Sequence, residues 1–238
     1  MHPRQTPRFV GLIEALIAFL VGSLLSSVAA EIAASSVGYR LTSSAPVPLV
    51  VTVSGLIGLW IGLIAGVLFY SRVWGTGSLV TDVGLSFKWW DLLVGAVAGI
   101  GTQLVLIPLL YLPFERADKT LNHRLSAPAK ADSAAVHGVL PVTVLVLFLA
   151  VFAPVVEELF FRGLLLRSIA RWLGPIAGVA LSAVLFGLAH FEPLQLAGLI
   201  LFGIVLGLLA YKTERLGPGM VAHAAFNAVT VFSLVLGR

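Results

Sequence analysis

Long apolar runs recur along the chain and leave little polar sequence between them. They cover residues 9–30, 48–70, 91–113, 139–161, 175–191, 194–211 and 218–236. A helix needs roughly 20 apolar residues to cross the hydrocarbon core of a bilayer. Only helices and closed barrels satisfy their backbone hydrogen bonds there. The pattern therefore predicts an all-α, polytopic membrane bundle with about seven transmembrane helices plus amphipathic or interfacial segments.

The composition agrees with a membrane protein. Hydrophobic residues make up 59% of the chain and charged residues 11%, against about 25% charged residues in soluble proteins. The longest polar segment, 114–138, has only the length of a linker, so we expect a single integral membrane domain over 1–238. Cysteine is absent from the sequence, which excludes disulfides and thiol catalysis.

Two segments between the apolar runs have their own character. Residues 71–90 are mixed in polarity and are expected to form an interfacial loop, with Trp74, Trp89 and Trp90 as headgroup-level anchors. Residues 162–173 place arginines four or five apart beside leucines, which predicts an amphipathic continuation of the fourth span. The Gly174-Pro175 pair is typical of a helix stop followed by a new start.

Basic residues in the loops bear on orientation and partners. With an inner amino terminus, nine lie inside (Arg4, Arg8, Arg72, Lys88, Arg162, Arg167, Arg171, Lys212, Arg215) and six outside (Arg40, Arg116, Lys119, Arg124, Lys130, Arg238). This balance favours a cytoplasmic amino terminus in the cell membrane, with 9–30 as a retained span. Because basic residues flank apolar runs, the net charge of +4 predicts contact with membrane lipids and no nucleic-acid partner.

Two adjacent glutamates end the fourth apolar run. A carboxylate at membrane depth costs roughly 2.5–3.5 kcal/mol on insertion scales, so Glu157 and Glu158 need a reason to be there. Arg162 follows Glu158 by four residues and can pair with it on one helix face. Glu157 points elsewhere and has no partner in its own segment. The sequence therefore marks Glu157 as a candidate functional residue.

Other polar residues of the last four apolar runs recur at helical spacing. Phe186 precedes His190 by four residues, and His223 precedes Asn227 by four. Glu157 lies 17 residues before Gly174 and His190 lies 16 after it. At 1.5 Å per residue they sit about 25 Å and about 24 Å from that turn, so an antiparallel hairpin places them level.

These residues support more than one chemistry. A carboxylate beside an imidazole can hold and deprotonate a water that attacks a carbonyl, while His and Asn donate to the resulting oxyanion. Glu157, His190 and His223 could instead bind zinc. Intramembrane Glu and His also serve proton-coupled transporters, although no internal repeat is visible. Gln103, another intramembrane polar residue, is expected to make a helix–helix contact.

The three motifs together resemble a known family. Glu157-Glu158-x-x-x-Arg162, Phe186-x-x-x-His190 and His223-x-x-x-Asn227 occur in the order found in the CPBP intramembrane proteases. That family includes the CAAX prenyl endopeptidase (Ras-converting enzyme) and the bacterial Abi-type proteins. The resemblance covers residues 139–230, which we interpret as a CPBP-like catalytic core.

The resemblance implies an intramembrane glutamate endopeptidase that cleaves a membrane-associated, CAAX-type or otherwise lipidated peptide. Glu157 then matches the general base and His190 its partner, with His223 and Asn227 stabilising the oxyanion. Glu158, Arg162 and Phe186 match supporting positions. We favour a mechanism without a cofactor, because Asn227 is a poor zinc ligand. Members linked to bacteriocin self-protection leave a non-enzymatic, peptide-binding immunity protein as the alternative.

Overall fold

The computed structural model describes residues 9–43, 45–134 and 138–236, and in these ranges the regular elements are helical. The predicted inner residues Arg4 and Arg8 and the predicted outer residue Arg238 lie outside the described residues. In order along the chain the elements are α1 (Val10–Ser36), α2 (Leu49–Val73), α3 (Leu79–Val83), α4 (Asp91–Gly101), η1 (Thr102–Leu106), α5 (Ile107–Ala117), α6 (Leu121–Ala134), α7 (Val139–Leu147), η2 (Phe148–Phe152), α8 (Ala153–Glu158), η3 (Leu159–Leu166), α9 (Arg167–Leu173), α10 (Pro175–Leu188), α11 (Leu196–Thr213) and α12 (Gly217–Leu236). The polytopic helical bundle predicted from the apolar runs is confirmed.

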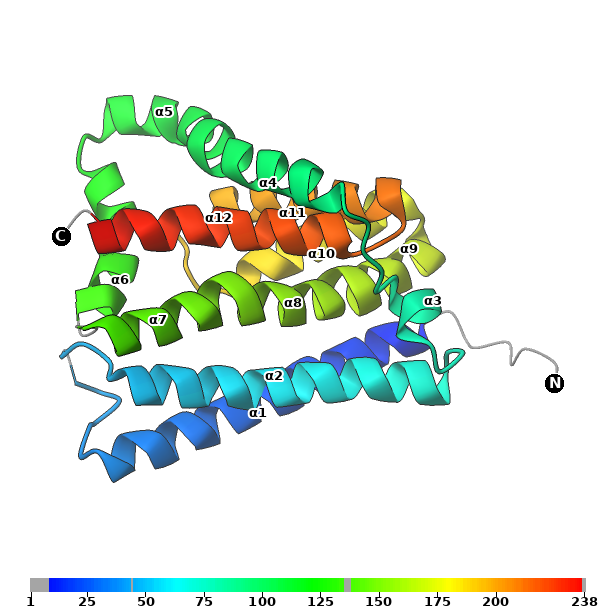
Figure 1. Ribbon diagram of the computed structural model, residues 1–238, viewed down its shortest axis with the longest axis horizontal. Coiled ribbons are helices and arrows are strands. Elements are labelled where there is room, and N and C mark those ends of the chain that lie inside the picture. Colours follow the sequence, from blue (N-terminus) through cyan, green and yellow to red (C-terminus); the bar gives the residue numbers. More distant parts are fainter. Residues whose placement is uncertain (1–8, 44, 135–137, 237–238) are drawn as a thin grey trace.

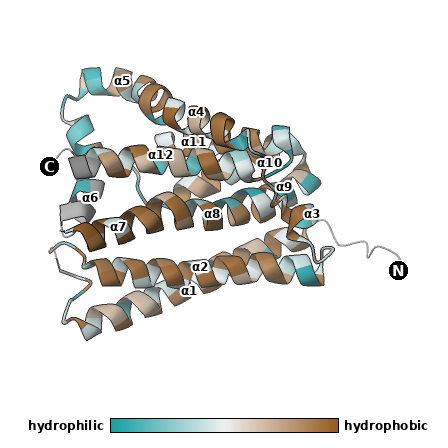
Figure 2. Cartoon of the chain, viewed as in Figure 1, coloured by the Kyte–Doolittle hydropathy of each residue, from teal (hydrophilic) through white to brown (hydrophobic). Residues whose placement is uncertain are grey.

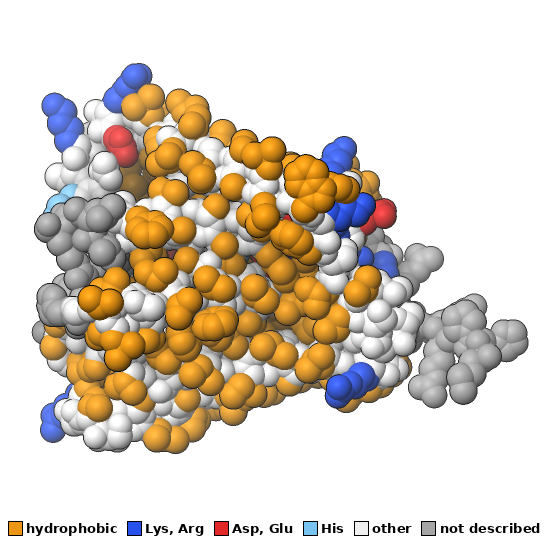
Figure 3. All heavy atoms as spheres, viewed as in Figure 1, with side chains coloured by type: hydrophobic (Ala, Val, Ile, Leu, Met, Phe, Trp, Pro, Cys, Tyr) orange, Lys and Arg blue, Asp and Glu red, His pale blue; other side chains and the backbone are white. Residues whose placement is uncertain are grey.

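Five helical stretches of the described chain are long and apolar enough to cross a membrane. They are Val10–Ser36, Leu49–Val73, Asp91–Ala117, Val139–Leu173 and Leu196–Thr213. The other two predicted spans are helices α10, apolar but only 14 residues long, and α12. Apolar residues cover the long helices (Figure 2). Lys and Arg side chains gather at the two ends of the long axis (Figure 3), as expected of a bundle that crosses a bilayer.

The helices run side by side in layers (Figure 1). Helices α1 and α2 form a hairpin on one side, α4 and α5 lie on the other, and α12 runs between α4–α5 and α7–α8. Glycines allow the closest approaches. A Cβ at Gly99 of α4 would collide with the carbonyl oxygen of Ala222 in α12, so these two backbones touch. Small residues at such crossings are typical of membrane helices.

Three stretches, η1, η2 and η3, are π-helical, with i→i+5 hydrogen bonds. Two of them precede a proline with the same spacing. Segment η1 begins at Thr102 and Pro108 follows six residues later, while η2 begins at Phe148 and Pro154 follows six residues later. A proline has no N–H, and local π turns accommodate it within a membrane helix. Such turns occur frequently at functional sites.

The segment 114–138 differs from its prediction as a linker. Helix α5 continues to Ala117, and α6 occupies Leu121–Ala134. The sequence pattern missed α6 because half of its residues are polar and its apolar residues, mostly alanine, show no strong amphipathic period. The mixed stretch 71–90 does contain turns around the short helix α3, with Trp89 75% exposed. Trp74, by contrast, donates from its indole nitrogen to Oε1 of Glu14 at 3.2 Å.

Candidate active site

The two glutamates at the end of α8 have different surroundings. Glu158 and Arg162 are both fully buried, and Nη1 of Arg162 lies 2.9 Å from Oε1 of Glu158. The pair predicted from the four-residue spacing is therefore present, but inside the bundle rather than on an amphipathic helix surface. Leucine and phenylalanine neighbours along η3 exclude water from the pair. Oε2 of Glu158 and Nε of Arg162 are buried there without a hydrogen-bond partner among the described residues.

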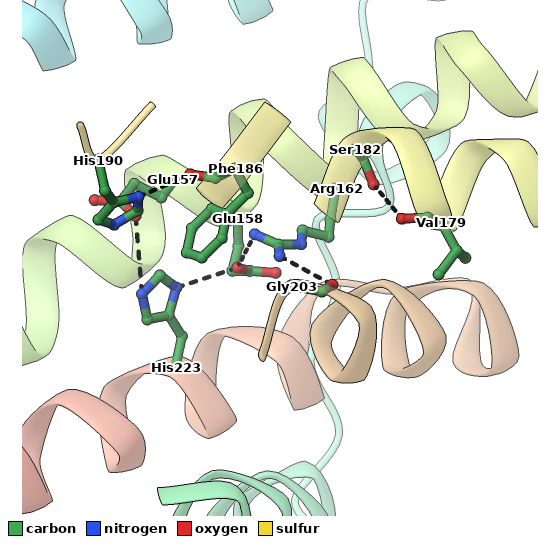
Figure 4. Close-up of polar contacts among 9 residues, drawn as sticks. All are labelled: Glu157, Glu158, Arg162, Val179, Ser182, Phe186, His190, Gly203 and His223. Atoms are coloured by element: carbon green, nitrogen blue, oxygen red, sulfur yellow. Dashed lines mark hydrogen bonds and ion pairs between the residues drawn. The ribbon is translucent and has the colours of Figure 1, made fainter. Parts of the chain in front are cut away.

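Two further contacts hold the Arg162 guanidinium. Its Nη2 donates to the backbone carbonyl of Gly203 in α11 at 3.2 Å. Its central carbon lies 4.4 Å from the centre of the Phe186 ring in α10. Arg162 thus joins η3 to α10 and α11 (Figure 4). The fork of a guanidinium can make several such contacts at once, which a lysine cannot.

His223 of α12 reaches both glutamates. Its Nδ1 lies 3.2 Å from Oε1 of Glu158, and its Nε2 lies 3.8 Å from Oε2 of Glu157 (Figure 4). The histidine is only 3% exposed. Phe186 and Phe202 meet its ring edge-on, with centroids 5.6 Å and 5.3 Å away. The imidazole is therefore fixed in orientation by two carboxylates and two aromatic rings.

His190 lies just beyond the helix in which it was predicted. Helix α10 ends at Leu188, and Phe191 follows His190 with a left-handed φ of 54°. Pro193 then prevents a simple continuation. Nδ1 of His190 lies 2.8 Å from the carbonyl oxygen of Phe186. A carbonyl only accepts, so Nδ1 carries a proton and Nε2 of the neutral ring is left as an acceptor.

Asn227 lies one turn beyond His223 on α12. Its Nδ2 donates to the backbone carbonyl of Leu149 at 2.8 Å. In the π register of η2, that carbonyl would receive its donor from residue 154, which is a proline without an N–H. The Asn227 amide therefore satisfies a carbonyl that the helix itself leaves free.

One cavity of about 720 Å³ brings the predicted catalytic residues together. Glu157, His190, His223 and Asn227 all line it, as does Phe186. Oε2 of Glu157 is buried there without a hydrogen-bond partner among the described residues. The structure records an ion-pair contact of Glu157 with His223 but, within the described chain, none with His190. The hairpin spacing therefore predicted the shared site but not this pairing.

The residues of the zinc alternative do not converge as a ligand set. In the part of the chain that the structure describes, no three His, Asp, Glu or Cys side chains are arranged to hold a metal ion. Glu157, His190 and His223 border one cavity, but among the described residues no contact of His190 with either of the other two is recorded.

Sequence reasoning missed the backbone partners of this site. The carbonyls of Gly203 and Leu149 hold Arg162 and Asn227, and no residue type marks such a carbonyl in advance. The one available signal was Pro154, since a proline inside an apolar run frees a carbonyl one turn earlier. Gln103, for which a helix–helix contact was expected, also lines the cavity, and its Oε1 has no hydrogen-bond partner among the described residues.

Comparison with known proteins identifies the region that carries this site. Residues 139–229 match the family model described as Type II CAAX prenyl endopeptidase Rce1-like. No curated protein and no solved structure matches the chain. The match begins at the first residue of α7 and ends within α12, so it contains all three motifs. The resemblance drawn from those motifs is confirmed.

Proposed function

We propose that the protein is an intramembrane endopeptidase, because residues 139–229 match the family model described as Type II CAAX prenyl endopeptidase Rce1-like. It hydrolyses a peptide bond of a membrane-associated substrate, such as a prenylated or otherwise lipidated protein. The observation that carries this proposal is the joint exposure of Glu157, His190, His223 and Asn227 to one cavity of about 720 Å³.

In this proposal Glu157 is the general base. Its side chain is 17% exposed and lines the cavity, and its Oε2 has no hydrogen-bond partner among the described residues, so the carboxylate is available to a reacting water. The free Nε2 of His190 accepts a hydrogen bond from the second O–H of that water and so orients it. The water oxygen attacks the substrate carbonyl carbon, and its proton passes to Glu157. Glu157 then delivers the proton to the departing amine nitrogen as the C–N bond breaks.

His223 and Asn227 act on the oxygen of the scissile carbonyl. Their side chains lie on one face of α12, one helical turn apart, and both line the cavity. The donors in this proposal are the second hydrogen of Asn227 Nδ2, whose first goes to Leu149, and a proton on Nε2 of His223. Donors held in place before the reaction stabilise the developing negative charge without reorganisation. Glu158 and Arg162 act indirectly, because their buried pair holds the His223 ring from the Nδ1 side. They are positioning residues rather than catalytic ones.

The proposed setting is the cell membrane with the amino terminus in the cytoplasm. The excess of basic residues on the predicted inner side supports this orientation. A reporter that is active only in the cytoplasm, fused to the amino terminus, tests this orientation. We expect the fusion to be active. An inactive fusion contradicts the orientation and leaves the proposed chemistry untouched.

The decisive variant is Glu157→Gln, which keeps the shape of the side chain and removes its basicity. Purified protein in proteoliposomes is incubated with a farnesylated CAAX peptide and with a mixed library of membrane-protein peptides, and products are identified by mass spectrometry. We expect cleavage by the wild-type protein and a loss of at least about 100-fold in the variant. Glu14→Gln is the matched control, because Glu14 is also a glutamate of a long apolar helix but accepts a hydrogen bond from Trp74. Full proteolysis by Glu157→Gln overturns the proposal.

A further inference from the structure

One wall of the cavity comes from outside residues 139–229. Gln103, Ile107, Tyr111 and Glu115 line it from the continuous helix α4–η1–α5. They recur every four residues and therefore share one helix face. The residues of the proposed catalytic machinery approach from α8, from the turn after α10 and from α12. A peptide in the cavity would contact both walls, so the α4–α5 wall is the part of this chain placed to select it.

The helix α4–η1–α5, which forms this wall, contacts the rest of the bundle near its two ends and separates from α12 in between. Helix α4 touches α12 at Gly95 and Gly99, where added Cβ atoms would meet backbone of Pro218 and Ala222. Beyond η1 the chain diverges from α12 (Figure 1). The far part of α5 is fixed again by the Tyr111 hydroxyl, which donates to the Leu194 carbonyl at 2.9 Å and accepts from Gly198 N at 3.2 Å. Gln103 lies near the point of divergence.

Among the buried side-chain atoms of the neutral polar residues that line this cavity, Oε1 of Gln103 alone lacks a hydrogen-bond partner within the described residues. The Tyr111 hydroxyl is satisfied as described, and Nε2 of Gln195 donates to the Leu125 carbonyl at 3.2 Å. The Thr230 hydroxyl donates to the carbonyl of Phe226 in its own helix. Oε1 of Gln103 is buried without a hydrogen-bond partner among the described residues. An unpaired buried amide is a cost to folding, which calls for a ligand to explain it.

We propose that Gln103 binds the main chain of the peptide substrate beside the scissile bond, an inference that rests on the proposed endopeptidase function. The primary amide offers a carbonyl and an NH₂ group, which complement the N–H and C=O of one peptide unit. The terminal torsion of glutamine is broad, so either group can turn to the cavity. A helical substrate satisfies its own backbone groups, whereas an unwound segment needs such a partner at membrane depth. The substrate is therefore taken as an extended peptide.

The test replaces the amide and measures binding and stability separately. Gln103→Met keeps the length of the side chain without its polar atoms, and Gln103→Asn keeps the amide with a shorter reach. Thr230→Val is the matched control, since Thr230 lines the same cavity but its hydroxyl is already bonded within α12. The peptide that the wild-type protein cleaves fastest from the mixed library is synthesised and used to measure KM and kcat. Thermal unfolding in detergent is recorded for each protein.

For Gln103→Met we expect KM to rise about tenfold with kcat changed less than about twofold, because one substrate hydrogen bond made in both ground and transition states is lost. Gln103→Asn should raise KM by a smaller factor, and Thr230→Val should leave KM unchanged. The unfolding temperature of Gln103→Met should stay the same or increase, because an unpaired buried group is removed.

An unchanged KM, or a lower unfolding temperature as the main effect, overturns the inference. Absence of cleavage by the wild-type protein overturns the proposed function itself, whereas normal cleavage by both Gln103 variants overturns only the assignment of Gln103.

Discussion

Nδ1 of His223 lies 3.2 Å from Oε1 of Glu158, at a buried contact between α12 and the end of α8. The same Glu158 oxygen lies 2.9 Å from Nη1 of Arg162. A cation and an imidazole therefore share one carboxylate oxygen inside the bundle. Through this contact the buried pair of Glu158 and Arg162 is connected to His223, which lines the cavity. The stability of the bundle and the geometry of the proposed active site depend on the same atoms.

Removing Arg162 should destabilise the protein strongly. Arg162→Leu leaves the Glu158 carboxylate buried without its cation and the Gly203 carbonyl without its donor. Breaking a buried pair from one side costs about 3–5 kcal/mol. The free energy of unfolding, measured by denaturant titration in detergent micelles, should fall by about that amount. Arg171→Leu provides the comparison, since Arg171 is exposed and should change the value by less than about 1 kcal/mol. If the two substitutions lower the free energy of unfolding equally, the buried contacts of Arg162 do not stabilise the bundle more than a surface arginine does.

The α4–α12 crossing should be intolerant of a single methyl group. In Gly99→Ala the new Cβ would collide with the carbonyl oxygen of Ala222 and lie 2.9 Å from its carbon. Neither backbone can yield without moving the next residue, His223. We expect a loss of about 1–3 kcal/mol in unfolding free energy and a marked loss of proteolysis.

The control for this crossing lies two residues further along the same helix. A Cβ at Gly101 would meet no atom within 4 Å. Gly101→Ala should therefore be neutral or slightly stabilising, because alanine has the higher helix propensity. If both alanine variants behave alike in unfolding and in proteolysis, the close approach at Gly99 does not position His223.

Asp82 gives the turn after α2 a pH-dependent stability. Burial alone would raise the pKa of Asp82, but hydrogen bonds from Ser71 Oγ at 2.5 Å and from Thr76 N and Oγ1 outweigh it. The pKa is therefore lowered from its ordinary value of 3.8. A carboxyl with a depressed folded-state pKa contributes stability above its unfolded-state pKa, and this contribution is lost as the pH falls through the folded-state pKa.

Asp82→Asn should accordingly lower the unfolding free energy at pH 7 by about 1–2 kcal/mol, the contribution of its charged hydrogen bonds. The difference between wild-type and variant protein should shrink below about pH 4, where the unfolded chain also protonates this carboxyl. Denaturant titrations at pH 7 and at the lowest pH at which both proteins fold measure it. A difference that does not change with pH shows that the carboxylate charge has no part in holding the turn.

Sequence spacing anticipated the bundle and the contents of the site because both depend on local periodicity. Apolar runs of membrane length fix the helices, and four-residue spacing fixes which side chains share a face. The pairing of His223 with both glutamates depends instead on how α12 crosses α8, which no local pattern encodes. The capture of the Leu149 carbonyl by Asn227 depends on a π turn. Helix α6 was missed because its polar and apolar residues are mixed and form no clear apolar face.

The two histidines of the cavity should separate stability from catalysis. His223 is buried between two carboxylates, so His223→Ala leaves Glu158 with one partner fewer and opens space beside Phe186 and Phe202. His190 lies in the exposed turn after α10, and within the described residues its imidazole makes one hydrogen bond, to the carbonyl of Phe186 four residues earlier. We expect His223→Ala to lower the unfolding free energy by about 2–3 kcal/mol. His190→Ala should keep it within about 0.5 kcal/mol while kcat falls at least about 100-fold through loss of the water-orienting imidazole. Unfolding titrations and single-turnover cleavage of the same protein preparations distinguish the two effects. A His190→Ala variant that is destabilised in proportion to its loss of activity would show that this histidine, too, is structural.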